Sequence, residues 1–103
     1  MRLTTATAIA ALALSSLGAL AQDKTVKIGN LNDMSSLYAD VGGPGSTLAA
    51  QMAAEDSGLA AKGWKIEVIG GDHQNKPDIG GGIARQWYDV DGVDVILDTP
   101  NSG

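Results

Sequence analysis

Three short apolar runs, separated by two segments with helical periodicity, make up most of the sequence after residue 24. The runs "TVKIGNL" (25–31), "WKIEVIG" (64–70) and "VDVILD" (93–98) are rich in β-branched residues and predict strands. Between them, apolar residues at i and i+4 spacings predict two helices, one from near Pro44 to Ser57-Gly58 and one over residues 77–90. This order of elements predicts an α/β fold with a parallel sheet of the doubly wound type.

The predicted sheet is incomplete. A doubly wound sheet carries helices on both faces, and no helix follows the third predicted strand before Gly103. A mature chain of this size buries a small core, and uncovered apolar faces reduce it further. We therefore expect an incomplete doubly wound sheet (β-α-β-α-β) from the leading part of a longer protein.

The second predicted helix contains three consecutive glycines, Gly80, Gly81 and Gly82. Each costs about 1 kcal/mol relative to alanine in a helix interior. We therefore expect this helix to approach the sheet or its neighbouring helix closely. Asn75 or Lys76 is expected to cap it, and the third strand, with its nearly continuous apolar run, is expected to be buried on both faces.

Residues 1–21 have the pattern of a signal peptide. Arg2 supplies a positive start, an uncharged stretch rich in alanine and leucine follows, and Ala19-Leu20-Ala21 offers small residues for cleavage before Gln22. A transmembrane anchor is the alternative. Threonine and serine interrupt the stretch, which is shorter than the roughly 20 strongly apolar residues that a spanning helix needs. We expect a cleaved signal peptide and export to the periplasm.

The charge and cysteine content exclude several classes of protein. The chain has 12 acidic and seven basic side chains, and cleavage would remove Arg2 from the basic set. An acidic chain without clustered lysine or arginine is a poor partner for nucleic acid. The absence of cysteine excludes both a disulfide-stapled scaffold and a lipid-anchored lipoprotein. The composition favours a freely soluble exported protein.

Two loops can carry ligand chemistry, since ligands of open parallel sheets bind beyond the carboxyl ends of the strands. They cover residues 30–43 and 99–103. The first holds glycines before a helix, but it lacks the Lys-Ser/Thr pair of a phosphate loop and the spacing of a dinucleotide fingerprint. It offers Ser35, Ser36 and Tyr38, and the helix after it favours an anion such as a carboxylate. A solvated connection is the alternative, although long structureless loops are uncommon unless functional.

We expect neither catalysis nor a bound metal or cofactor. His73 is the single histidine and has no cysteine to join it in a metal site. Asp89, Asp91, Asp94 and Asp98 resemble a calcium-ligand series, but the twelfth position of such a loop is Pro100 rather than glutamate, so we interpret them as turn and strand-end residues. No G-x-S-x-G elbow or convincing nucleophile–base pair is present.

The order of these segments resembles a known family. A signal peptide followed by "GNLNDMSSLYADVGGPGSTLAAQMAAEDSG", "KIEVIGGDHQNKPD" and "ARQWYDVDGVDVILDTPNSG" is similar to the start of the periplasmic substrate-binding proteins of the leucine/isoleucine/valine-binding type. These proteins are the receptors of branched-chain amino-acid ABC importers. The resemblance covers essentially the whole chain after the signal peptide.

The resemblance implies a two-lobed clamp, of which residues 22–103 would form part of the N-terminal ligand-binding lobe. It implies that Ser36 and Tyr38 in the first loop, and Asn101 and Ser102 in the third, bind ligand. Leu37 stands where the family usually has proline, and Pro100-Asn101 is not the commonest form of the third loop. The implied ligand is therefore left open among amino acids, aromatic acids and amides.

For the full-length protein the resemblance implies a monomer that delivers its ligand to an ABC permease and catalyses no reaction. Two alternatives remain at this stage. One is an exported α/β enzyme with catalytic residues beyond Gly103, and the other is a ligand-sensing receptor domain of the same fold.

Overall fold

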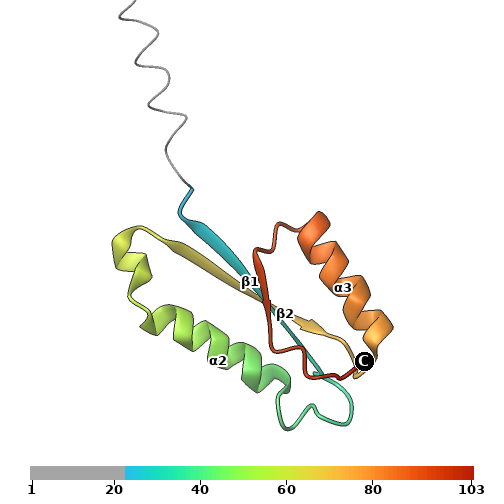
Figure 1. The fold of residues 1–103 in the computed structure, drawn as a ribbon. Helices are drawn as coiled ribbons and strands as arrows, with labels where there is room; N and C mark the ends of the chain where they lie inside the picture. The colour runs from blue at the N-terminus through green and yellow to red at the C-terminus, as the bar shows by residue number, and fades with distance from the viewer. Residues whose placement is uncertain (1–22) are drawn as a thin grey trace, which may run out of the picture.

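A computed structural model describes residues 23–103, so the expected signal peptide (1–21) and its cleavage site lie outside the described residues. The three strands are β1 (Thr25–Asn32), β2 (Lys65–Asp72) and β3 (Val95–Leu97). They form one parallel sheet in the order β2-β1-β3. The helices are α2 (Gly43–Asp56), the 3-10 helix η1 (Leu59–Lys62) and α3 (Pro77–Asp89). The helices α2 and α3 lie on opposite sides of the sheet, which confirms the predicted doubly wound α/β fold (Figure 1).

The strand register brings the carboxyl ends of the three strands to the same end of the sheet. Thr25 pairs with Lys65 and Asn32 with Asp72, so β1 and β2 end at the same level. Asn30 pairs with Leu97, the last residue of β3. The loops after all three strands therefore leave from the same edge, as expected for parallel strands.

Alternation along the strands separates the two faces of the sheet. Gly29 and Leu31 share the α3 face with their partners Ile69 and Gly71, because side chains two residues apart point the same way. On this face the buried residues Leu31, Trp87 and Val93 form the core, with Ile69, Ile83, Ala84 and Ile96 packed against it. These three side chains are the buried hydrophobic residues within residues 23–103.

The Trp87 ring from α3 fits over two glycines of the sheet. A methyl group added at Gly71 would lie 2.7 Å from Cζ2 and 2.8 Å from Cη2 of Trp87, and one added at Gly29 would also collide with the ring. Carbon atoms in contact lie about 3.5–4.0 Å apart, so neither position has room for a side chain. The absence of side chains at Gly29 and Gly71 is what lets the Trp87 ring lie directly against β1 and β2.

Three details differ from the sequence-based expectations. Of the three α3 glycines, Gly80 alone makes a close approach: a methyl group there would lie 3.3 Å from Cβ of His73, whereas at Gly81 and Gly82 nothing lies within 4 Å. Lys76 is the N-cap residue of α3, but no side-chain hydrogen bond caps the helix. The third strand is shorter than predicted, and it is not buried on both faces.

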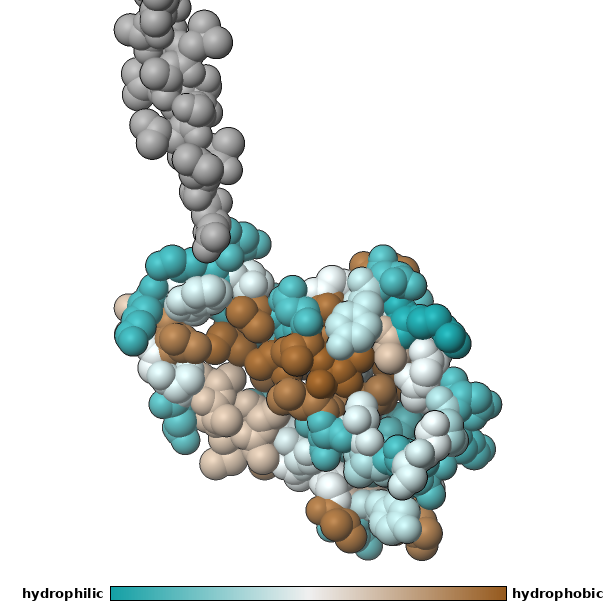
Figure 2. Space-filling model, in the orientation of Figure 1, coloured by the Kyte–Doolittle hydropathy of each residue, from teal (hydrophilic) through white to brown (hydrophobic). Residues whose placement is uncertain are grey.

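The α2 face of β3 is uncovered. Val95 and Leu97 are each 40% exposed, because α2 packs mainly over β2 and β1. Figure 2 shows an apolar area over the sheet between α2 and α3. None of the helices within residues 23–103 is long and apolar enough to cross a membrane.

The two edge strands of this sheet differ in chemistry. The free edge of β2 carries an exposed ion pair between Lys65 Nζ and Glu67 Oε1, at 2.9 Å. The free edge of β3 has the short sequence Val95-Ile96-Leu97, which carries no charge.

Candidate functional site

A cavity of about 780 Å³ opens at the edge of the sheet where the three strands end. The loop after β1, the start of α2, the loop after β2 and the chain after β3 all contribute to its walls. The lining residues are Asn32, Asp33, Tyr38, Val41, Gly42, Gly43, Ser46, Asn75, Asp98, Pro100, Asn101 and Ser102. This is the place predicted for a ligand in an open parallel sheet, and its lining contains no lysine, arginine or histidine.

Asp33 organises the loop after β1. Its side chain is 1% exposed, and it accepts backbone N–H bonds from Ser35, Ser36 and Tyr38 at 3.2, 2.8 and 2.9 Å. The Ser36 hydroxyl donates a fourth bond, at 2.6 Å. Burial raises the pKa of Asp33, but these four hydrogen bonds outweigh it and lower the pKa from 3.8 to about 2. Asp33 is thus a structural carboxylate whose acceptor capacity is used by its own loop.

Asp72, at the end of β2, also holds the loop after β1 by hydrogen bonds. It accepts the backbone N–H of Met34 at 2.9 Å and the Ser35 hydroxyl at 2.6 Å. The hydrogen bond from Ser35, followed by that from Met34, holds the pKa of this carboxyl below its usual range. The beginning of the loop is therefore held by two carboxylates at the same end of the sheet, Asp33 after β1 and Asp72 at the end of β2, and Tyr38 projects from a defined turn.

Asn32 connects the end of β1 to two other elements. The residue is fully buried, and its Nδ2 donates to Asn30 Oδ1 at 2.9 Å, to the Gly43 carbonyl at 2.9 Å and to Asp98 Oδ2 at 3.3 Å. Because all three partners are acceptors, they fix which end of the amide carries the nitrogen. Asn32 Oδ1 is buried without a hydrogen-bond partner in the structure. Asn32 therefore ties β1, the start of α2 and the residue after β3 together.

Asp98 directly follows β3 and lies in the wall of the cavity. Its Oδ2 accepts the Ser46 hydroxyl at 2.6 Å in addition to the Asn32 amide. The backbone turns sharply here: φ is 76° at Asp98 and 23° at Thr99, both in the left-handed region. Aspartate tolerates that region better than most residues, whereas threonine, being β-branched, is strained there. Asp98 was expected to be a turn or strand-end residue, and it directly follows β3. Its place in the lining of the cavity was not predicted.

Asn101 links the loop after β3 to the loop after β2. Its Nδ2 donates to Asn75 Oδ1 at 2.8 Å, and its Oδ1 accepts the backbone N–H of Gly103 at 2.8 Å. Ser102 lies in the same wall. These contacts give the final segment of the chain a defined place beside the cavity.

The structure brings three of the four sequence-predicted site residues together. Tyr38, Asn101 and Ser102 line one cavity, and Tyr38 is 48% exposed. Ser36 is not among the lining residues; its hydroxyl and its N–H both bond to Asp33. Asn32, Asp33, Ser46, Asn75 and Asp98 line the cavity but were not predicted. Their sequence signal is a polar residue at a strand end or in the first turn of the following helix.

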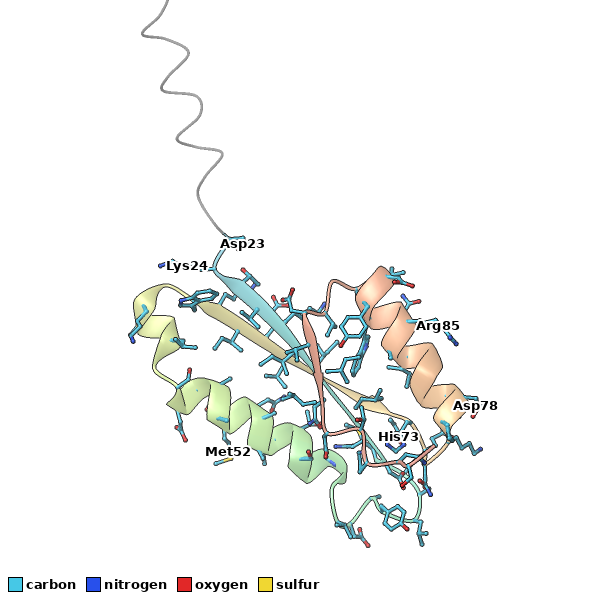
Figure 3. All side chains as sticks on the ribbon, viewed as in Figure 1. Asp23, Lys24, Met52, His73, Asp78 and Arg85 are labelled. Atoms are coloured by element: carbon cyan, nitrogen blue, oxygen red, sulfur yellow. The ribbon has the colours of Figure 1, made fainter. Side chains whose placement is uncertain are left out.

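His73 takes no part in this cavity. It is 3% exposed, its Nδ1 accepts the backbone N–H of Asn75 at 2.9 Å, and its Nε2 is buried without a partner in the structure (Figure 3). Within residues 23–103, no group of three or more histidine, cysteine, aspartate or glutamate side chains is placed to hold a metal ion.

Comparison with known proteins assigns the chain to a family. The periplasmic binding protein family matches residues 25–103. A solved structure of a branched chain amino acid ABC transporter periplasmic ligand-binding protein from Burkholderia xenovorans is 49% identical, with a TM-score of 0.66. A periplasmic binding protein from Burkholderia mallei is 47% identical, with a TM-score of 0.65.

The matched regions cover 71% and 73% of this chain, and 20% of each of those longer chains. A search of curated protein sequences finds no match. The family match spans nearly all of the described residues, including β1, β2, β3 and the loops that line the cavity. The chain is a member of the periplasmic binding protein family.

Proposed function

We propose that this chain forms part of the N-terminal lobe of an exported solute-binding protein that delivers an amino acid, or a related small carboxylate or amide, to an ABC importer. The observation that carries the proposal is the cavity at the carboxyl edge of the sheet. Its walls come from all three strand ends and offer hydroxyl, amide and backbone groups that suit a small polar ligand.

Three of the lining side chains are proposed to contact the ligand directly. Tyr38 presents a half-exposed aromatic ring from a turn fixed by Asp33, and Asn101 and Ser102 line the same cavity from the loop after β3. Aromatic rings contribute large contact areas, and hydroxyl and amide groups satisfy a ligand carboxylate without a buried cation. Ser36 is proposed to act indirectly, through the hydrogen bond to Asp33 that shapes the Tyr38 turn.

The remaining features of the proposal concern the whole protein. Residues 1–21 act as a cleaved signal peptide, residues 22–103 belong to the first lobe, and the complete protein is a periplasmic monomer that closes two lobes on its ligand. The chain performs no catalysis and requires no cofactor. The resemblance of a 49%-identical protein described as an ABC transporter periplasmic ligand-binding protein supports transport over sensing.

The test uses two forms of the protein. One is the mature segment, residues 22–103. The other is a chimera in which residues 23–103 replace the matching segment of the Burkholderia xenovorans protein, which supplies a second lobe. Both are titrated by isothermal calorimetry with amino acids, aromatic acids and amides, and the unaltered Burkholderia protein is run in parallel.

We expect the chimera to bind at least one compound with a Kd in the micromolar range or below. The mature segment alone should bind none of them that tightly, because a clamp buries its ligand between two lobes. A folded chimera that binds nothing would overturn the proposed function. Chemical conversion of any compound during the titration would instead support the exported-enzyme alternative.

A further inference from the structure

We propose that Asp98 recognises a positively charged nitrogen of the ligand and thereby restricts the ligand class to amino acids and amines, excluding simple carboxylic acids. This inference rests on the proposed solute-binding function and narrows it. It gives a role in ligand specificity to the residue after β3, which was not among the four site residues predicted from the sequence.

The balance of charge in the cavity is the first support. Two carboxylates, Asp33 and Asp98, line it, and no lysine, arginine or histidine does. Asp33 receives four hydrogen bonds from its own loop, so its charge is already well solvated by protein groups. Asp98 differs, because its two hydrogen bonds, from Asn32 and Ser46, both go to Oδ2. Within residues 23–103, Asp98 Oδ1 accepts no hydrogen bond.

The two donors to Asp98 also hold the carboxylate in place. Asn32 is fully buried and has its amide orientation fixed by three acceptors. Ser46 is fixed on α2, and its hydroxyl lies 2.6 Å from Oδ2. A carboxylate held on one oxygen by neutral donors keeps its second oxygen free for a partner. The strongest partner is a cationic N–H group, because such charge-assisted bonds are roughly twice as strong as neutral ones.

The position of Asp98 also argues against an anion at the start of α2. A methyl group added at Gly42, the N-cap of that helix, would lie 4.0 Å from Asp98 Oδ2. The Asp98 carboxylate therefore already lies near the positive end of the α2 helix dipole. A ligand carboxylate placed there would meet a like charge, which disfavours it. The favourable orientation for an amino acid puts its ammonium at Asp98 and its carboxylate toward the Ser102 hydroxyl, since the Asn101 amide already donates to Asn75.

The backbone conformation supplies an independent sign of specialisation. Asp98 and Thr99 both have positive φ. Residues in such strained conformations persist only where the surrounding structure holds them, and they cluster at ligand sites. This turn directs the chain after β3 along the cavity wall. Asparagine tolerates the same conformation as aspartate, so Asp98→Asn removes the charge with little change to the backbone.

Two sets of matched probes separate the chemical groups. The first is L-leucine, isocaproate, which lacks the ammonium, and isoamylamine, which lacks the carboxylate. The second is L-phenylalanine, hydrocinnamate and phenethylamine. Binding to the mature segment is followed by amide NMR, which detects millimolar affinities and includes the Asn32 side-chain NH₂ signal. Calorimetry on the chimera provides the same comparison in a two-lobed protein and replaces NMR if the segment alone is unfolded.

We expect binding of the ammonium-bearing members of at least one set, with shifts at Asn32 and Ser46. Asp98→Asn should weaken that binding by about tenfold to one-hundredfold and leave the carboxylate-only probe unchanged or tighter. Ser46→Ala should cause a smaller loss, because it frees the carboxylate to rotate. Asp89→Asn is the matched control, since it removes the same charge at the far end of α3 and should leave every affinity unchanged.

The outcomes distinguish this inference from the function on which it rests. If carboxylate-only probes bind as well as the amino acids, or if Asp98→Asn weakens all probes equally, Asp98 does not read a cationic nitrogen and the inference fails while solute binding stands. If no probe binds to either form of the protein, the proposed function fails, and the inference fails with it.

Discussion

Replacing Gly71 by alanine tests the close packing of the Trp87 ring on the sheet. The added methyl group would lie 2.7 Å from Cζ2 of Trp87 and 3.3 Å from Cδ1 of Leu31. Normal carbon contacts are about 3.5–4.0 Å, so the ring or the strand must move by about 0.8 Å or more. The ring has little freedom to move, because Trp87 is 6% exposed and also lies against Gly29.

The expected net effect follows from two opposing contributions. Overpacking a well-packed core costs about 1–3 kcal/mol. Replacing glycine by alanine within a strand returns about 0.5–1 kcal/mol, because the unfolded chain loses conformational freedom. We therefore expect Gly71→Ala to lower the free energy of unfolding by about 1 kcal/mol, near the middle of the range of about 0–2.5 kcal/mol that these two contributions leave. For a small domain this corresponds to a fall of about 1 M in the urea midpoint.

The assay is urea unfolding of residues 22–103, followed by far-ultraviolet circular dichroism. Gly82→Ala is the matched control, because a methyl group there meets nothing within 4 Å. It should raise the free energy of unfolding by about 0.5–1 kcal/mol, since glycine is a poor helix former. Combining Gly71→Ala with Trp87→Leu should cost less than the sum of the two single changes. A Gly71→Ala that stabilises the protein as much as Gly82→Ala does would refute the packing argument.

Three further predictions concern charge and hydrogen bonding. Asp33→Asn should be most destabilising at neutral pH. Because the folded pKa of about 2 lies below the ordinary 3.8, the contribution of Asp33 is complete above pH 3.8 and is lost as the pH falls toward 2; a pH-independent difference between variant and wild type would contradict this. Asn32→Ala should cost about 1–3 kcal/mol in urea unfolding, because it leaves the buried Gly43 carbonyl without its donor. Glu67→Gln should leave the urea midpoint unchanged within error at any salt concentration, because its partner Lys65 is 72% exposed; a reproducible fall in the midpoint would contradict this.

The fold was largely predictable because its signals are local. Runs of β-branched residues predict the strands, and apolar residues at i and i+4 spacing predict the helices. The element order and the parallel sheet therefore follow from the sequence. The length and exposure of β3 did not follow, because they depend on where α2 lies across the sheet. For the same reason Gly81 and Gly82 were misinterpreted: a sequence shows that a helix contains glycine but not which face of the helix meets a neighbour.

The site was predicted less completely, for a physical reason that Ser36 and Asp98 illustrate. Both are short polar residues near strand ends, and sequence alone does not say whether such a residue faces a cavity or bonds to its own loop. Ser36 bonds to Asp33, and Asp98 lines the cavity because a left-handed turn redirects the chain. The hydrogen-bond network of Asn32, Ser46 and Asp98 joins segments up to 66 positions apart. The sequence of any single loop therefore does not reveal this network.

The unequal edges of the sheet have a consequence for how residues 23–103 behave in concentrated solution. The β2 edge carries Lys65 and Glu67, and charged side chains on an edge discourage pairing with another chain. The β3 edge offers uncharged Val95-Ile96-Leu97, with two of these side chains 40% exposed on one face. Self-association of the isolated segment should therefore begin at β3. A lysine in place of Val95 would be the first change to make for a sample that stays monomeric during spectroscopy.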